Sequence, residues 1–483
     1  MEYKNVWKGY TQSDLDELES LAQDYISFIS QCKTERECAS YAIEQAKRSG
    51  YKSLDEILAS GDALKPGDKV WAHAQGKALI LVHMGTQPLE QGLNILGAHI
   101  DSPRLDVKQN PLYESSDFAL LDTHYYGGIK HYQWVTTPLA IHGVVAKTSG
   151  ETVKVTIGED AQDPVFCITD LLPHLAAKQM ENSARKLIEG ENLDVLVGSR
   201  PLVLPETENE KSNEGTTSKN EEQSPEDLAK KEPVKAMVLQ ILKEKYGIEE
   251  TDFLSAELEI VPAGAARDCG FDRSMVLGYG QDDRACAYPS LRAQIDIIAP
   301  KKTAVCVLVD KEEIGSVGAT GMASRFFENT IAEVMELAKE NSGLALRRAL
   351  AASSMLSSDV SAGFDPLYPS VYETKNAAYL GKGLVFNKYT GARGKSGSND
   401  ASAEYVAKIR KIMEDNNIAF HTSELGRVDE GGGGTIAFIP AEYGMDVIDS
   451  GVSVLSMHSP WEVASKADIY EAYKGYKAFL QDA

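Results

Sequence analysis

Two adjacent glutamates, Glu312 and Glu313, follow the apolar run "TAVCVLV" in the segment "LVDKEEIGS". Two like charges at the end of a buried strand are unfavourable unless a cation or a proton compensates them. One carboxylate can hold a metal ion, while its neighbour takes a proton from a metal-bound water and passes it to a leaving amine. The pair therefore predicts metal-assisted hydrolysis, with one glutamate as a metal ligand and the other as a general base.

Other residues of the metal-ligand type stand in equivalent places along the chain. Three further apolar runs end in such residues: "LNILGAHID" in His99 and Asp101, "ASSMLSSD" in Asp359, and "GVSVLSMH" in His458. A fifth segment, "GYGQDDRACAY", carries Asp282 and Asp283 between a glycine-flanked turn and a predicted helix. In an open parallel sheet, ligands bind outside the carboxyl ends of the strands. These distant residues are therefore expected to meet in one crevice.

A set of imidazoles and carboxylates suits two divalent ions about 3.5–4 Å apart that share one bridging carboxylate. Zinc is the first expectation, and cobalt or manganese also fits. Asp101, two residues after His99, can orient that imidazole without binding the metal itself. Each motif alone has an ordinary structural explanation, since a Glu-Glu pair is normally solvated and "QDDR" normally caps a helix. Their occurrence together favours a metal site.

The elements that must position these residues follow from the apolar periodicity. Helical spacing dominates the first 60 residues, whereas 77–85 and 93–100 are short apolar runs typical of buried strands. Short β-like runs fill 106–158, with "TSGE" as a predicted turn. From Glu257 onward, strand-like and helix-like stretches alternate, which predicts an α/β fold with a mainly parallel sheet flanked by helices.

The predicted organisation is a discontinuous catalytic domain, interrupted by a β-rich insertion. The catalytic domain is expected at 1–105 and 254–483, and the inserted domain at 106–253. Within the insertion, the polar segment 205–227 contains no aliphatic or aromatic side chain, and we expect it to be flexible.

The composition excludes several classes of protein. The 483 residues carry a net charge of −23, which repels phosphate backbones and anionic membranes, so neither nucleic acid nor a membrane is an expected partner. No run approaches the roughly 18 apolar residues of a membrane span. The six cysteines are scattered, as is typical of a reducing compartment, and we expect a cytoplasmic protein.

At these residues the sequence closely resembles the M18 family of metalloaminopeptidases, which includes aspartyl aminopeptidase and belongs to the di-zinc exopeptidase clan. The resemblance covers almost the whole chain. It is carried by motifs that occur in the family's order: "GAHIDSPRLDVK", "QDDRACAY", "DKEEIGS", "SSDVSAGFDP", "EGGGGTIA" and "SMHSPWE".

The resemblance implies a role for each residue of the predicted site. His99 and Asp359 would hold one metal, Glu313 and His458 the other, and Asp282 would bridge the two. Glu312 would be the general base. The resemblance also implies a dimerisation role for the insertion, assembly into a tetrahedral dodecamer, and short peptides as substrates. The acidic-substrate preference is not carried over, because Ser361 and Ala362 stand where aspartyl aminopeptidases have a histidine.

Three further residues are candidates for substrate binding. Lys388 precedes "GARGKSGS", a loop that lacks the glycine spacing of a phosphate loop and is expected to line the pocket. Gly433 belongs to "GGGG", which either allows close backbone approach to a substrate or forms a turn. His174, in the insertion, either reaches the site of a neighbouring subunit or packs structurally.

The residues favour an aminopeptidase that removes the N-terminal residue of short peptides. Two alternatives stay open. One is a deacylase or carboxypeptidase built on the same two-metal site, and the other is a non-catalytic self-assembling scaffold.

Overall fold

The structure is a computed structural model, and it describes residues 3–204, 225–340, 342–391 and 394–483. Internal contacts divide the chain into two units, Met1–Pro103 with Ala265–Ala483, and Arg104–Gly264. The sequence placed the second boundary at 253/254, but strand β10 (Ala256–Pro262) pairs along its whole length with β7 (Leu139–Ala146) inside the second unit. Of the predicted flexible segment, 205–224 lies outside the described residues, and 225–227 begins helix α5 (Pro225–Lys231).

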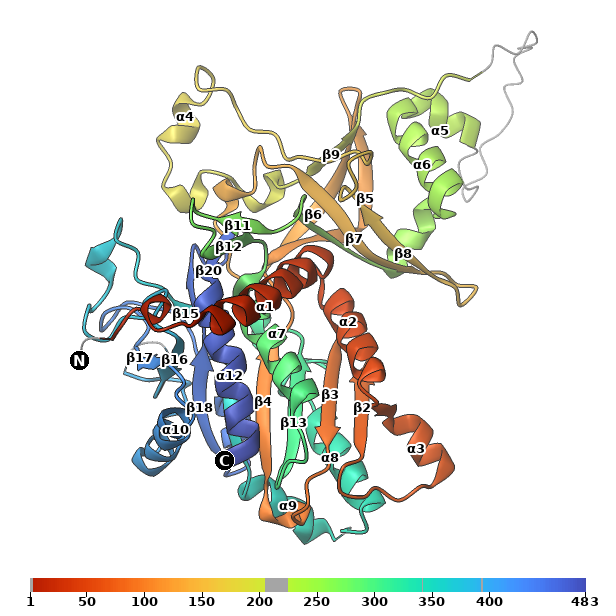
Figure 1. Ribbon diagram of the computed structural model, residues 1–483. Coiled ribbons are helices and arrows are strands. Elements are labelled where there is room, and N and C mark those ends of the chain that lie inside the picture. Colours follow the sequence, from red (N-terminus) through yellow and green to blue (C-terminus); the bar gives the residue numbers. More distant parts are fainter. Residues whose placement is uncertain (1–2, 205–224, 341, 392–393) are drawn as a thin grey trace, which may run out of the picture. The chain divides into compact units, whose positions relative to one another are not determined.

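The first unit is built on a nine-stranded mixed sheet (Figure 1). Its strands lie in the order β1 (Lys52–Ser53), β2 (Lys69–Ala74), β3 (Ala78–His83), β13 (Thr303–Val309), β4 (Leu93–His99), β14 (Ser354–Ser358), β18 (Asp446–Gly451), β16 (Leu384–Asn387) and β17 (Phe420–Thr422). The four central strands β13, β4, β14 and β18 run parallel, and antiparallel pairs flank them at β3–β13 and β18–β16. The predicted apolar runs at 77–85 and 93–100 are confirmed as strands β3 and β4.

The central strands are buried on both faces, and their side chains alternate between two cores. In β13, Ala304 and Cys306 join one apolar cluster, whereas Val305 and Val307 join the other. The first cluster includes side chains of helices α1 (Gln12–Gln31), α2 (Glu35–Arg48), α7 (Gln281–Asp296), α10 (Ala403–Asp415) and α12 (Lys466–Asp482). The second includes side chains of α3 (Leu54–Ser60), α8 (Phe326–Leu337), α9 (Gly343–Ala351) and α11 (Phe438–Ala441). Helices therefore cover both faces of the sheet.

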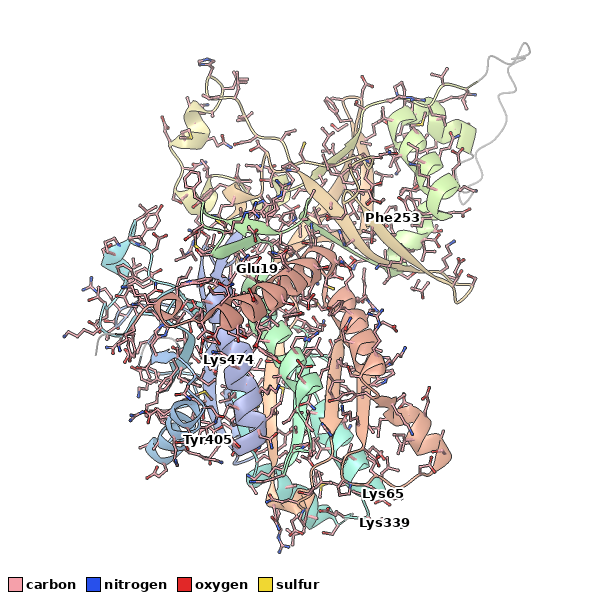
Figure 2. All side chains as sticks on the ribbon, viewed as in Figure 1. Glu19, Lys65, Phe253, Lys339, Tyr405 and Lys474 are labelled. Atoms are coloured by element: carbon pink, nitrogen blue, oxygen red, sulfur yellow. The ribbon has the colours of Figure 1, made fainter. Side chains whose placement is uncertain are left out.

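Helix α1 shows how local sequence and packing agree. Thr11 and Asp14 form a capping box at its start, and its apolar stripe is buried as the helical spacing predicted. An ion pair ties it to the C-terminal helix α12: Lys466, fully buried, lies 2.8 Å from the carboxylate of Glu19, which is labelled in Figure 2.

A five-stranded sheet in the same unit contains the run "GVSVLSMH". Its order is β11 (Arg267–Cys269), β12 (Met275–Gly278), β20 (Glu462–Ser465), β19 (Ser453–Leu455) and β15 (Ser361–Ala362). The sequence predicted that His458 ends a strand of the main parallel sheet. The strand β19 belongs instead to this smaller sheet, because β18 already occupies the place beside β14.

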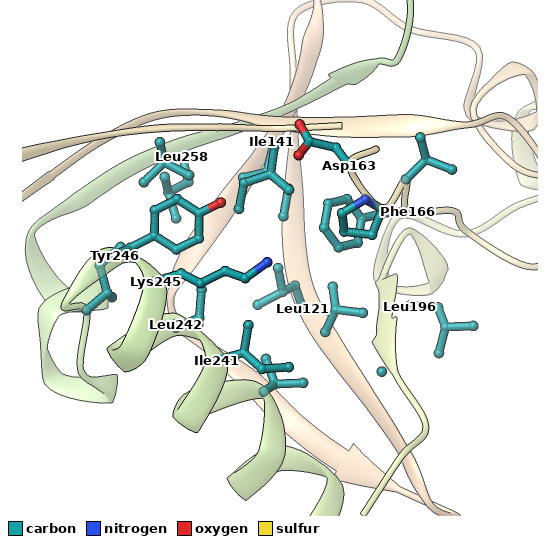
Figure 3. Close-up of a pocket in the computed structure, with 18 of the residues that line it drawn as sticks. Leu121, Ile141, Asp163, Phe166, Leu196, Ile241, Leu242, Lys245, Tyr246 and Leu258 are labelled. Carbon is teal, nitrogen blue, oxygen red and sulfur yellow. The ribbon is translucent and has the colours of Figure 1, made fainter. Parts of the chain in front are cut away.

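The second unit contains a six-stranded antiparallel sheet. The order is β8 (Thr152–Ile157), β7, β10, β5 (Arg104–Ser115), β6 (Phe118–Tyr126) and β9 (Val195–Gly198). The predicted "TSGE" turn joins β7 to β8 and is closed by a hydrogen bond from Lys147 N to Glu151 O of 2.8 Å. Two further helices, α4 (Ala177–Met180) and α6 (Pro233–Tyr246), complete the unit. Aliphatic side chains of α6 and of the sheet line a pocket of about 460 Å³ (Figure 3).

None of the described helices combines the length and the hydropathy that a membrane span requires.

Candidate metal centre

The parallel pairing of β4 and β13 brings the first candidate residues together. His99, the last residue of β4, lies opposite Val309, the last residue of β13. The chain then turns at Lys311, a non-glycine residue with φ of 70°, into a short 3₁₀ helix, Glu312–Ile314. Both glutamates therefore stand at the same edge of the sheet as His99.

Asp101 fixes the backbone of this glutamate pair. Its two carboxylate oxygens accept the backbone N–H groups of Glu312 and Glu313, each at 3.2 Å. The same carboxylate lies 3.3 Å from Nδ1 of His99, and Asp101 is fully buried. One side chain thus links the imidazole to both glutamates.

Asp282 lies between the two histidines. Its Oδ1 is 3.2 Å from Nε2 of His99, and its Oδ2 is 3.1 Å from Nε2 of His458. His458 Nε2 is also 3.6 Å from the Glu313 carboxylate. The turn before Asp282 depends on Gly280, whose φ is 70° and where a Cβ would lie 2.0 Å from the Arg284 guanidinium.

Asp359, the residue directly after β14, completes the cluster. One nitrogen of His99 and one oxygen each of Asp283 and Asp359 lie within 4.8 Å of one another, and His99, Asp282 and Glu313 form a second such group. The cluster thus contains all five predicted ligands together with Asp283. The two groups share His99.

Burial dominates the electrostatics of the cluster. It raises the pKa of Glu313 and Asp359 well above the usual range, and neighbouring carboxylates add to the effect; burial also raises the pKa of Glu312. Burial acts on Asp282 in the same direction, but hydrogen bonds from His458 and His99 overcome it and hold the pKa of Asp282 below its usual value. So many carboxyl groups can share this space only if protons or cations balance their charge.

Comparisons with known proteins find M18 aminopeptidases that match this chain over all or nearly all of its length. The family model "Aminopeptidase I zinc metalloprotease (M18)" matches residues 28–480. The chain belongs to the M18 aminopeptidase family. A probable M18 family aminopeptidase 1 of Clostridium acetobutylicum is 57% identical over 481 residues, covering 100% of this chain and 98% of that protein.

Solved structures of M18 proteins have the same fold. The chain matches the crystal structure of an M18 aminopeptidase from Thermotoga maritima with a TM-score of 0.90 and 41% identity, over 100% of both chains. A structure from S. cerevisiae, described as a dodecamer of mApe1, matches 96% of this chain and 97% of that chain with a TM-score of 0.73. At 20% identity the yeast protein shows the fold alone.

The side chains of this M18 protein fit the zinc that the family model names. Imidazole nitrogens and carboxylate oxygens are both zinc ligands. Two buried carboxylate oxygens, Glu313 Oε1 and Asp283 Oδ1, have no hydrogen-bond partner in the part of the chain that the structure describes. Buried oxygens without a donor are costly, and a cation at this place would satisfy them.

The three residues predicted to bind substrate are not part of this cluster. Lys388 is exposed and pairs with Asp400, which also pairs with Lys395 at 2.8 Å. Gly433 is exposed, with open space at the position of a Cβ. His174 is exposed in the second unit, between β8 and α4. Their roles stay predictions.

Asp283 stands in the sequence beside the predicted bridge Asp282 but was assigned no role of its own. In the structure it is fully buried, and it accepts the backbone N–H of His99 at 3.3 Å. The signal was present in the doubled aspartate of "QDDR". Of the two carboxylates, Asp282 lies beside both His99 and His458, whereas Asp283 lies near His99 and Asp359.

Proposed function

We propose that this M18 protein is an aminopeptidase that hydrolyses the N-terminal residue from short peptides with two divalent ions, most readily zinc. His99 and Asp359 would hold one ion, Glu313 and His458 the other, and Asp282 would bridge them. Cobalt or manganese is expected to replace zinc. Glu312 is the proposed general base.

The observation that carries the proposal is the position of Asp282. A bridging carboxylate must direct one oxygen to each of two ions, and the two oxygens of Asp282 lie beside different imidazoles, at 3.2 and 3.1 Å. Each imidazole has a second carboxylate close by, Asp359 for His99 and Glu313 for His458. In the proposed arrangement, His99 with Asp359 and His458 with Glu313 would be the two sets of ligands, and both sets would share Asp282.

Bound divalent ions would supply a Lewis acid and lower the pKa of water, so that it is a usable nucleophile near neutral pH. The chain itself supplies the proton transfer. Glu312 lies next to Glu313 on the short 3₁₀ helix, and Asp101 holds its backbone. Burial raises the pKa of Glu312, which favours its taking a proton from water and returning it to the departing amine.

A matched pair of variants tests the proposal. Glu312→Gln keeps the shape of the side chain but cannot accept the proton, so it is expected to retain both metals and to lose about 10²–10⁴-fold in kcat. Asp282→Ala is expected to lose metal as well as activity. Metal content by elemental analysis and turnover of aminoacyl fluorogenic substrates, after chelation and addition of Zn²⁺, Mn²⁺ or Co²⁺, are the measurements. Near-normal turnover by Glu312→Gln would refute the role of the base.

The same assay separates the alternative hydrolases. Acetylation of the substrate's α-amino group is expected to abolish turnover by an aminopeptidase, whereas a deacylase would still act. Assembly without any peptide turnover in the three metals would favour a scaffold.

We also propose that the chain self-associates, into dimers and then a dodecamer. Apolar side chains are exposed along the segment of the second unit that contains His174: Val165, Leu171, Leu172, Leu175 and Met180. Exposed apolar stretches of this kind mark interaction sites. Light scattering is expected to give about twelve times the 52.6 kDa chain mass, and Leu175→Asp is expected to reduce it. A monomer would refute this proposal.

The six free thiols favour a reducing, cytoplasmic location.

A further inference from the structure

Glu462 lies directly behind two of the proposed metal ligands. It is the first residue of β20 and is 1% exposed. Its Oε1 accepts the backbone N–H of His458 at 2.7 Å, and its Oε2 accepts the backbone N–H of Asp282 at 3.2 Å. Both oxygens are therefore occupied by backbone donors, so this carboxylate is placed to position ligands and not to bind a metal.

The two residues that Glu462 connects are far apart in sequence and need to be held. His458 has φ of 64°, in the left-handed region that non-glycine residues seldom adopt, and such a conformation persists only where surrounding contacts impose it. Asp282 lies in the non-helical start of α7. Its φ of −82° and ψ of 107° are not those of a helix. A carboxylate that bridges both amides fixes the distance between the two side chains.

Glu462 is itself held in place by the first core. Gln281, fully buried, donates from Nε2 to the carbonyl oxygen of Glu462 at 2.6 Å, and Tyr25 of α1 donates to Oε1 of Gln281 at 3.2 Å. Strand β20 also pairs with β12, with Glu462 opposite Gly278. These contacts fix the backbone from which the Glu462 carboxylate extends.

Asp101 holds the other half of the cluster in the same way, through the backbone N–H groups of Glu312 and Glu313. We propose that Glu462 is a positioning residue that sets the separation of Asp282 and His458, and thereby the affinity and geometry of metal binding. This inference rests on the proposed metal-binding role of those two residues.

The test is Glu462→Gln, whose amide has only one acceptor oxygen for the two backbone N–H groups. Metal-free protein is titrated with Co²⁺, and the dissociation constants, by competition with a chelator, and the visible absorption spectrum are recorded. Substituting a residue that hydrogen-bonds to a metal ligand typically lowers metal affinity by about 10–100-fold. We expect a weakening of about this size for at least one ion, with an altered Co²⁺ spectrum. Wild-type affinity and spectrum would overturn the proposal.

Asp468→Asn is the matched control. Asp468 is also fully buried, and its carboxylate also accepts two backbone N–H groups, those of Gly381 and Gly383 at 2.7 Å each, but neither belongs to a proposed ligand. It is expected to keep the wild-type Co²⁺ affinity and spectrum. Equal losses in Asp468→Asn and Glu462→Gln would show that general destabilisation is responsible, and would overturn the proposal.

If Glu462→Gln does not fold, Glu462→Asp provides a second test. It keeps both acceptor oxygens but is one methylene shorter, so it cannot reach both amides, and metal affinity is again expected to fall. Unchanged affinity in this variant would overturn the proposal. The Asp282→Ala variant distinguishes a failure of the proposed function from a failure of the positioning role of Glu462. Full metal binding by Asp282→Ala contradicts the proposed function itself, whereas its loss of metal together with normal binding by the Glu462 variants contradicts only the positioning role.

Discussion

Replacing Asp101 tests how strongly one carboxylate controls the catalytic edge of the sheet. The Asp101→Asn amide keeps one acceptor oxygen, and its NH₂ group faces the backbone N–H of either Glu312 or Glu313. One partly buried N–H is then left without its acceptor, which costs up to about 1–3 kcal/mol. Asp101→Ala removes the acceptors of both N–H groups, each now at 3.2 Å, and is expected to cost about twice as much.

The cost should appear in catalysis, because the two N–H groups belong to the proposed base and a proposed ligand. A loss of about 1–3 kcal/mol corresponds to about 5–150-fold in kcat/KM. We expect Asp101→Asn to fall in that range and Asp101→Ala to fall further. The assay is kcat/KM on an aminoacyl fluorogenic peptide substrate, with metal content measured in the same samples.

Two measurements distinguish this explanation from simple instability. Urea unfolding of the chelated proteins gives the change in the free energy of unfolding, and variants that remain folded and fully loaded are compared at saturating metal. If both variants are fully loaded and keep wild-type kcat/KM, the two hydrogen bonds do not position Glu312, and the reasoning fails.

Three further perturbations follow from the structure. Gly451→Ala would place a Cβ 1.8 Å from the carbonyl oxygen of Asp359. We expect the free energy of unfolding, measured with urea, to fall by about 1–3 kcal/mol, and metal binding, measured by Co²⁺ titration, to weaken. Wild-type values in both measurements would contradict this. Burial raises the pKa of Asp449 to about 7, so between about pH 4 and pH 7 the folded state keeps a proton that the unfolded state loses. The free energy of unfolding contributed by this group therefore falls as pH rises through that window, and Asp449→Asn, in chelated protein, is expected to show a shallower decline; an identical pH profile would refute it. Chelation is expected to remove activity and to lower the melting temperature, because the buried carboxylates lose their counter-charge. Added zinc is expected to restore both. Full activity of the metal-free protein would refute the two-metal proposal.

Local sequence was sufficient to predict the elements that surround the site. The apolar runs at 77–85 and 93–100 are strands, and the stripe through Leu18 and Tyr25 is the buried face of a capped helix. These predictions succeed because side-chain periodicity depends on the geometry of a single element. The boundary at 253/254 was less accurate, because the membership of β10 is decided by its pairing with β7, more than a hundred residues away in sequence.

The residue types of the candidate site were likewise visible in the sequence, since imidazoles and carboxylates at the ends of apolar runs suggest metal binding. Their number and order also carried the resemblance to the M18 family, which the comparisons confirm. The sequence did not show that His458 comes from a separate five-stranded sheet. It also could not show that the carboxylates of Asp101 and Glu462 each hold two backbone amides.

The sequence by itself determined which side chains are available for chemistry and which elements carry them, because both depend on residue identity and local spacing. The tertiary structure alone decided that the two oxygens of Asp282 lie beside different histidines, and that buried oxygens of Glu313 and Asp283 have no hydrogen-bond donor among the described residues. The physical reason is that these properties arise from distances of a few ångströms between segments more than 150 residues apart. Such distances are set by sheet pairing and turn geometry and not by any local pattern.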